Sequence, residues 1–322
     1  MEPAPYTPPP FMGNGHIQSI FPSLFRKVTD LEYTRERIPT PDGDFLDLDW
    51  APLDTGKGPG SNKLAIISHG LEGCAHRAYV KGMARAVNTA GWDALAWNYR
   101  GCSGEDNATL RFYHNGATDD LAQVIQHAGD KGNYKEIALV GFSLGGNLSL
   151  VHLGRDNVDP RVSRAIVFSV PCDLFAAART LALPQNRIYM KRFLRMLRGK
   201  IQAKAQKFPG AIDDAGYEEI TDFKGFDDRY TAPIHGFKSA EDYWEQCSSI
   251  QYLPHINRPC RIINAMNDPF LSRECYPIAQ AGYNENIQLS MPKSGGHVGF
   301  IKFNSQGRYW SEQQAVDFLT AF

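Results

Sequence analysis

The chain has 322 residues, of which 43% are hydrophobic and 21% are charged, and its formal net charge at pH 7 is −1. This is an ordinary soluble composition with enough apolar side chains for a large core, divided into one or two domains. The balanced charge produces no global field that would favour nucleic acid, so we expect no nucleic-acid partner.

The six cysteines are scattered and form no C-x-x-C pair. We therefore expect reduced thiols in a cytoplasmic protein, with neither a disulfide framework nor a zinc site. The first ten residues contain five prolines and no apolar h-region, which argues against a signal peptide. No apolar run approaches the eighteen or so residues that a membrane-spanning helix needs, so we expect none.

Residues 1–30 form a predicted N-terminal extension to the core. The stretch 14–25 mixes aromatic side chains with His16 and is expected to pack across the domain, with His16 in a structural role. Alternating segments at 31–38 and 45–50 flank an Asp42-Gly43 pair, which predicts a β-hairpin. The Gly- and Pro-containing segment 54–62 is expected to be a loop.

Strand and helix patterns alternate from residue 63 to residue 170. Predicted strands occupy 64–69, 92–98, 137–140 and 165–170, with helices at 77–90, at 118–127 and from 146 onwards. Further strands are expected at 261–265 and 287–291, followed by a closing helix at 309–322. Such alternation predicts an α/β fold with a mostly parallel, doubly wound sheet.

The predicted strand at 137–140 runs directly into Gly141-Phe142-Ser143-Leu144-Gly145, and a helix pattern follows. This is the G-x-S-x-G pattern in a strand-turn-helix context, where a strained turn pushes the serine hydroxyl out of the sheet. We therefore predict that Ser143 is a nucleophile.

A serine hydroxyl needs an imidazole to take its proton and a carboxylate to orient that imidazole. Asp268 follows the predicted strand at 261–265, and His297 follows the last predicted strand. The order Ser143, Asp268, His297 is the one that this topology requires, with each residue at a strand carboxyl end. Asp173, just after the sixth strand, is the alternative acid.

The turn after the predicted strand at 64–69 is a candidate for half of an oxyanion hole. We predict that the backbone N–H groups of Leu71 and Leu144 together bind a developing negative charge, and a plain strand-to-helix loop is the alternative. His69 is expected to fix this loop. The turn 99–104 lacks the Gly-Lys-Ser/Thr of a phosphate-binding loop and is interpreted as structural.

The strand alternation stops between residues 171 and 249, which we predict to be a helical cap inserted after the sixth strand. The core would then comprise 1–170 and 250–322. The predicted helix at 188–206 is amphipathic and rich in Lys and Arg, so it could lie on an anionic membrane. The favoured interpretation is a solvated charged face over a buried apolar stripe, which the acidic stretch at 213–228 could neutralise.

These residues resemble the α/β-hydrolases, and more narrowly the YheT-like branch with its eukaryotic ABHD and plant Emb-type relatives. The resemblance covers nearly the whole chain, and the matching stretches begin at Asn14, His69, Asn98, Gly141, Phe226, Asn267 and Gly295. It departs mildly at Gly15, where proline is common in the branch, and at Glu72, where a small polar residue is common. The resemblance implies a serine esterase or a lipase-like hydrolase.

The predicted activity is therefore the cleavage of a carboxylic ester, lipidic or not, by a Ser143–His297–Asp268 triad. A peptidase, amidase or thioesterase would use the same triad, since all pass through a tetrahedral oxyanion. A ligand-binding module on the same fold is the alternative that is not an enzyme. The site needs no cofactor and no metal. A small ester or lipid is the expected partner, while the oligomeric state and the physiological substrate stay open.

Overall fold

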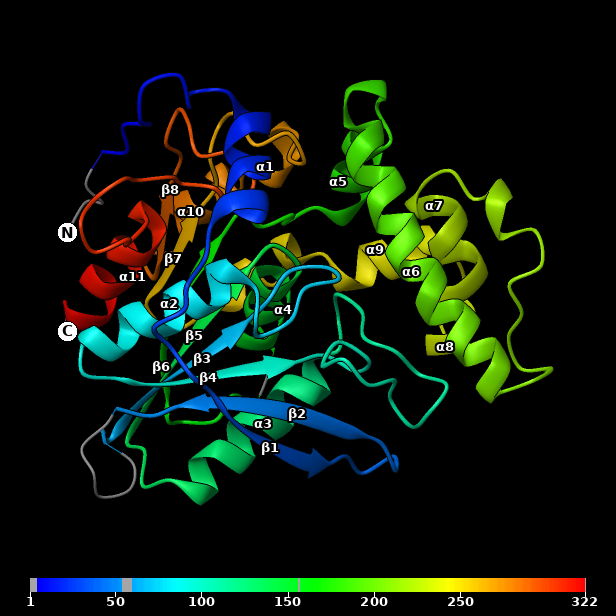
Figure 1. Ribbon diagram of the computed structural model, residues 1–322, viewed down its shortest axis with the longest axis horizontal. Coiled ribbons are helices and arrows are strands. Elements are labelled where there is room, and N and C mark those ends of the chain that lie inside the picture. Colours follow the sequence, from blue (N-terminus) through cyan, green and yellow to red (C-terminus); the bar gives the residue numbers. More distant parts are fainter. Residues whose placement is uncertain (1–4, 54–59, 156, 322) are drawn as a thin grey trace.

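An eight-stranded sheet with the strand order β1-β2-β4-β3-β5-β6-β7-β8 forms the centre of the computed structural model (Figure 1). The structure describes residues 5–53, 60–155 and 157–321, so most of the loop predicted at 54–62 and the first four residues of the proline-rich segment lie outside it. The strands are β1 (Thr34–Pro39), β2 (Phe45–Ala51), β3 (Lys63–Ser68), β4 (Asp93–Asn98), β5 (Glu136–Phe142), β6 (Val162–Phe168), β7 (Cys260–Ile263) and β8 (Ile287–Ser290).

Among the strands of the described residues, β2 alone runs against the others. It pairs antiparallel with both β1 and β4, while β4, β3, β5, β6, β7 and β8 are parallel neighbours. The predicted mostly parallel, doubly wound sheet is therefore confirmed, and so is the hairpin around Asp42-Gly43, which joins β1 to β2.

Helices cover both faces of the sheet, which explains why the parallel strands are apolar throughout. The helices are α1 (Gly15–Phe25), α2 (Ala78–Thr89), α3 (Thr118–Lys131), α4 (Leu144–Leu153), α5 (Leu174–Leu181), α6 (Arg187–Lys207), α7 (Phe223–Phe226), α8 (Ala232–His235), α9 (Ala240–Cys247), α10 (Ile278–Tyr283) and α11 (Trp310–Thr320). None of those in the described ranges is long and apolar enough to cross a membrane.

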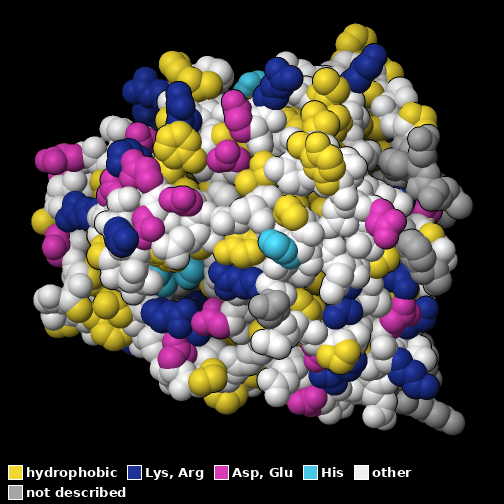
Figure 2. Space-filling model, turned by 180° about the vertical axis from the view of Figure 1, so that it is seen from behind, with side chains coloured by type: hydrophobic (Ala, Val, Ile, Leu, Met, Phe, Trp, Pro, Cys, Tyr) yellow, Lys and Arg dark blue, Asp and Glu magenta, His cyan; other side chains and the backbone are white. Residues whose placement is uncertain are grey.

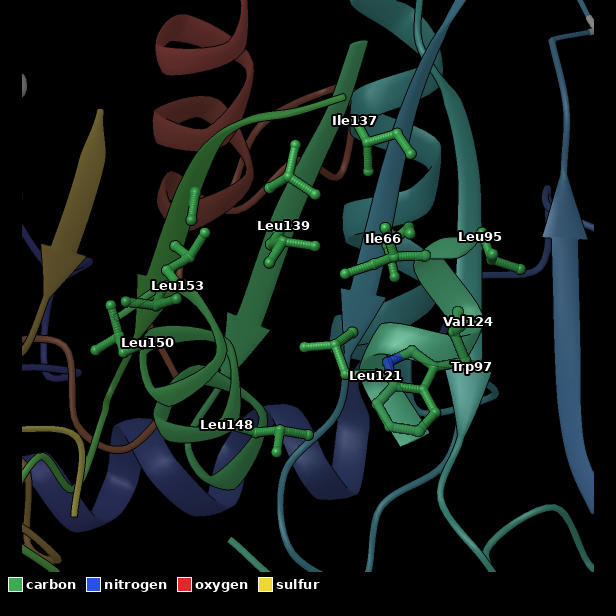
Figure 3. Close-up of a cluster of buried hydrophobic side chains, with 14 of the residues drawn as sticks. Ile66, Leu95, Trp97, Leu121, Val124, Ile137, Leu139, Leu148, Leu150 and Leu153 are labelled. Atoms are coloured by element: carbon green, nitrogen blue, oxygen red, sulfur yellow. The ribbon is translucent and has the colours of Figure 1, made fainter. Parts of the chain in front are cut away.

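Successive strand residues point to opposite faces and so belong to two separate core clusters. Ile66 of β3 packs with α3 and α4, through residues such as Leu121 and Leu148 (Figure 3). Its neighbour Ile67 packs on the other side, among residues of α2 and α11 such as Met83. This three-layer arrangement holds the carboxyl ends of the parallel strands in fixed positions.

The N-terminal segment forms a helix that the sequence pattern does not reveal. The Asn14 side chain accepts hydrogen bonds from the amides of His16 and Ile17, at 2.9 and 3.2 Å, and so caps the start of α1. Pro22 lies inside the helix, where it removes one backbone donor. A proline in the middle of a short segment is usually a sign against a helix, which explains the missing signal.

The chain between β6 and β7 contains only helices and turns, and these lie beside the sheet at one end of its strands (Figure 1). They have hydrophobic clusters of their own, to which α6 contributes a buried stripe made of Met190, Leu194, Leu197 and Ile201. The spacing of this stripe is that of one helix face, so α6 packs as an amphipathic helix.

The charges of α6 are not neutralised as the sequence suggested. Within the described residues, Arg198 alone on this helix pairs with the acidic stretch, at 3.6 Å from Glu218. Lys200 and Lys204 instead reach the loop after β4, where Lys200 donates to Gly101 O and Lys204 donates to Thr109 O at 2.7 Å. The acidic stretch therefore neutralises little of this helix, because α6 lies across the loop after β4, while the expected buried apolar stripe is present.

Candidate active site

Ser143 stands at the sharp turn between β5 and α4. Its backbone adopts φ 52° and ψ −118°, a conformation that residues with a Cβ seldom adopt. The amide of Ser143 donates to Phe168 O at 2.9 Å, which ties the turn to β6. Strain of this kind persists only when the surrounding structure enforces it, and it concentrates at functional sites.

The glycines on either side of Ser143 are required by close backbone packing. A Cβ on Gly141 would lie 2.5 Å from Gly145 O, and one on Gly145 would lie 2.4 Å from Ser68 O. Because strand β3, the turn and helix α4 meet without room for a methyl group, the turn holds the Ser143 hydroxyl in one place.

The structure brings Ser143, His297 and Asp268 into one hydrogen-bonded chain. His297 Nε2 lies 3.0 Å from Ser143 Oγ, and His297 Nδ1 lies 2.9 and 3.1 Å from the two oxygens of Asp268. The Asp268 side chain is completely buried, whereas 12% of the His297 side chain is exposed. With Nδ1–H donating to the carboxylate, Nε2 is free to accept the proton of the serine hydroxyl.

Asp173, the alternative acid, serves as a helix cap. Its carboxylate accepts a hydrogen bond from the amide of Ala176 at 2.9 Å and caps the start of α5. Asp268 is thus the carboxylate that contacts His297, and its Oδ1 also accepts from the Phe270 amide at 2.9 Å. The Phe270 ring stacks on the imidazole of His297, with centroids 4.1 Å apart.

The loop that carries His297 is braced by residues that sequence reasoning missed. The His297 amide donates to Ser19 Oγ at 2.8 Å, and this hydroxyl donates to Gly15 O at 2.7 Å. The next amide, of Val298, donates to Ser169 Oγ at 2.8 Å. Helix α1 is therefore part of the support of the imidazole. The signal in the sequence was the resemblance of the stretch from Asn14, which contains Ser19.

The turn after β3 lies against Ser143, since a Cβ on Gly70 would be only 3.3 Å from Ser143 Cβ. Within the described residues, the amides of Leu71 and Leu144 donate no hydrogen bond. The other amides of this turn all do, namely Gly70 to Tyr79 Oη at 2.9 Å, Glu72 to Tyr113 Oη at 2.9 Å and Gly73 to Gly70 O at 3.0 Å. The two predicted oxyanion donors are thus both without an acceptor at the site.

His69 is buried, and its ring nitrogens are bonded to the backbone of Gly70 and Tyr99. Its Nδ1 lies 2.8 Å from Gly70 O, and its ring packs 4.0 Å from that of Tyr99. Burial lowers the pKa of His69 to about 3, so the ring stays neutral and donates to the carbonyl. His16 is likewise held elsewhere, with Nδ1 3.0 Å from Tyr189 Oη of α6.

Two cavities meet at Ser143. One encloses about 560 Å³ of empty space, counting the part open to solvent, and has an apolar wall that includes Leu174, Ala177 and Leu181 of α5. The other, of about 1070 Å³ on the same measure, runs between α1 and α6 and is lined by Arg77 and Arg192 among others. Within the described residues, no group of three or more His, Cys, Asp or Glu side chains could hold a metal ion.

Comparison with known proteins places these features in a family. The family model described as the alpha/beta hydrolase fold matches residues 65–216. The YheT protein of Escherichia coli (strain K12), whose name carries a provisional esterase assignment, is 32% identical over 99% of this chain and 94% of its own. The embryogenesis-associated protein EMB8 of Picea glauca is 29% identical over 98% of this chain and 72% of its own.

A solved esterase of Pyrococcus furiosus, Pf2001, shares the fold, with a TM-score of 0.60 at 17% identity, covering 98% of this chain and all of that chain. The likeness to this structure concerns the fold alone. The identity to YheT, in contrast, extends over nearly the whole of both chains. The protein therefore belongs to the YheT-like branch of the α/β-hydrolase family.

Proposed function

We propose that this protein is a serine hydrolase that cleaves carboxylic esters, including esters with apolar acyl chains, through an acyl-enzyme. The observation that carries the proposal is the chain of hydrogen bonds from Ser143 Oγ through His297 to buried Asp268. No other arrangement at the site is needed to activate the serine.

In the first half of the reaction, His297 Nε2 takes the proton of Ser143 as Oγ attacks the ester carbonyl. The negative charge on the carbonyl oxygen is bound by the amides of Leu71 and Leu144, which donate to no acceptor within the described residues. The imidazolium then gives its proton to the leaving alcohol, while Asp268 stabilises the positive ring. In the second half, His297 activates water, which releases the acid.

The apolar cavity beside Ser143 supports an acyl chain as the part of the substrate that enters it. Its walls combine core residues such as Leu271 with Leu174 and Leu181 of α5. Two relatives are named for lipid substrates: phospholipase ABHD3 of Homo sapiens, 26% identical over 92% of this chain, and monoacylglycerol lipase of Saccharomyces cerevisiae, 29% identical over 80%. We therefore include lipidic esters in the proposed substrate class.

We further propose that residues 171–249 act as a cap, with the core formed by 1–170 and 250–322. Helices α5, α6 and α7 contribute Leu174, Phe193 and Phe223 to the wall of the cavity that Ser143 also lines. A lid of this kind excludes water and shapes the acyl pocket, so chain-length preference would reside in its residues.

The test combines covalent labelling with a panel of substrates. A fluorophosphonate should label the wild-type protein once, at Ser143, and should leave Ser143→Ala unlabelled with an unchanged melting temperature. A p-nitrophenyl ester series, compared with matched thioesters and anilides, should be cleaved fastest as oxygen esters. Faster turnover of the anilides or the thioesters would assign the site to an amidase or a thioesterase. A serine that stays unlabelled while ligands bind beside it would contradict the proposal.

A further inference from the structure

We infer that the exposed residues of α1 and of the first half of α6 form a docking surface for an anionic lipid bilayer. This α1–α6 surface consists of Ile17, Ile20 and Leu24 on α1 and Ile188, Lys191 and Arg195 on α6. Binding to a bilayer is a property separate from the proposed ester hydrolysis, because it does not depend on catalysis at Ser143.

The apolar part of the surface is an uncovered stripe. Ile17, Ile20 and Leu24 recur at the spacing of one helix face, and 64% of Leu24 is exposed. Helix α1 carries no Asp, Glu, Lys or Arg, so no charge must be desolvated when this face enters an interface. On α6, Ile188 continues the stripe with 76% of its surface exposed. An apolar helix face left in contact with water marks an interaction site.

The charged part of the surface is cationic without compensation. Helix α6 contains no Asp or Glu over its 21 residues. Lys191 and Arg195 are exposed and recur with Ile188 at the spacing of one helix face, beside the buried stripe of this helix. Neither has a hydrogen-bond or ion-pair partner among the described residues. Free cations beside exposed apolar side chains complement the headgroups and acyl boundary of an anionic leaflet.

The two helices are neighbours in space. His16 of α1 stacks on Tyr189 of α6, with ring centroids 5.7 Å apart, and Arg192 donates to Ser23 Oγ at 3.4 Å. Both helices lie toward the upper side of the molecule in Figure 1, and Figure 2, the view from behind, shows hydrophobic, Lys or Arg, and Asp or Glu side chains on that side.

The surface adjoins one of the cavities at the reaction centre through Ile20. The 1070 Å³ cavity runs between α1 and α6, is lined by Ile20 and Arg192, and has Ser143 and His297 at its inner end. A bilayer seated on the α1–α6 surface would therefore face the route to the serine. This geometry favours a lipid bilayer over an acidic protein, because a flat, extended partner can contact both helices and the entrance at once.

The sequence pattern alone pointed to a different surface. The helix at 188–206 reads as a basic amphipathic helix that could insert its apolar stripe, but that stripe is buried within the cluster of cap residues. In the structure, α6 offers mainly cations and α1 offers the apolar side chains. The docking surface is thus assembled from segments that lie about 170 residues apart in the chain, as the contact between His16 and Tyr189 shows.

Co-sedimentation of the full chain with vesicles tests this inference without using activity. More wild-type protein should pellet with phosphatidylcholine vesicles that contain phosphatidylglycerol than with phosphatidylcholine alone, and less should pellet as salt is raised. Because each cation near an anionic leaflet strengthens binding about fivefold, Lys191→Glu/Arg195→Glu should weaken binding by at least ~25-fold. Leu24→Ser/Ile188→Ser should lower binding by about tenfold or more for each side chain, on both kinds of vesicle.

Two control variants match these changes away from the α1–α6 surface. Lys135→Glu/Lys238→Glu alters the net charge by the same amount, and Tyr283→Ser removes a side chain that is 93% exposed on α10. Both should bind vesicles as the wild type does. Equal losses in the controls and the test variants would overturn the inference, as would binding that ignores anionic lipid. Wild-type protein that stays in the supernatant with every vesicle would also overturn the inference. A protein would then be the alternative occupant of this surface.

Discussion

The substitution Asp268→Asn tests whether Asp268 or Asp173 is the acid of the triad. Asn removes the charge that stabilises the imidazolium, but keeps an oxygen for the Phe270 amide, so the loop should fold normally. The matched control is Asp173→Asn, because Asn caps a helix about as well as Asp does and the Asp173 carboxylate caps α5.

The size of the effect follows from the geometry. Opposite charges at the 2.9 Å separation of Asp268 Oδ2 and His297 Nδ1 attract by about 6 kcal/mol at an effective dielectric constant of about 20. If the ring is positive only in the transition state, this energy corresponds to a fall in kcat of about 10⁴-fold. KM should change little, because the substrate does not touch the carboxylate.

The assay is the steady-state hydrolysis of p-nitrophenyl butyrate, with the rate of fluorophosphonate labelling as a second readout of the serine. Both readouts should fall together for Asp268→Asn and stay at the wild-type level for Asp173→Asn, with circular dichroism melts confirming the fold. Loss of activity in Asp173→Asn with activity retained in Asp268→Asn would refute the assignment of the acid and the reasoning from geometry.

Three further changes probe the brace, a buried carboxyl and the acyl pocket. Ser19→Ala removes the acceptor of the His297 amide, worth about 1 kcal/mol, so kcat should fall about fivefold with KM unchanged, and Ser19→Thr should restore it. Burial raises the pKa of Asp227 to about 7, so its contribution to stability is full below about pH 4 and is lost as pH rises towards 7. In urea titrations, Asp227→Asn should therefore gain about 1.4 kcal/mol over the wild type for each pH unit in that interval. Ala177→Phe should fill the cavity and lower kcat/KM for octanoate relative to butyrate by about tenfold.

Each of these three expectations has an outcome that contradicts it. The brace is not a positioning device if Ser19→Ala lowers the melting temperature and kcat together and Ser19→Thr restores neither. A difference between the wild type and Asp227→Asn that stays constant with pH would show that this carboxyl is ionised in the folded protein. An acyl chain lies elsewhere if Ala177→Phe slows all chain lengths equally.

Much of the fold was readable from local pattern. The alternation from residue 63 to residue 170 and the Asp42-Gly43 turn gave the strand types and their largely parallel arrangement, since both depend on short-range periodicity and turn chemistry. The catalytic role of the triad is still a prediction. Its three residues could nevertheless be identified from the sequence, because α/β folds bring the carboxyl ends of their parallel strands to one edge of the sheet.

The sequence by itself determined the elements and the residue types of the site, because periodicity, turn residues and the order of Ser143, Asp268 and His297 are local properties of the chain. Only the tertiary structure decided what those residues touch. It placed Ser19 beneath His297, buried the apolar face of α6, and set Lys200 and Lys204 against the loop after β4. The physical reason is that these contacts join segments far apart in the chain, and their partners are chosen by packing, which no local pattern encodes.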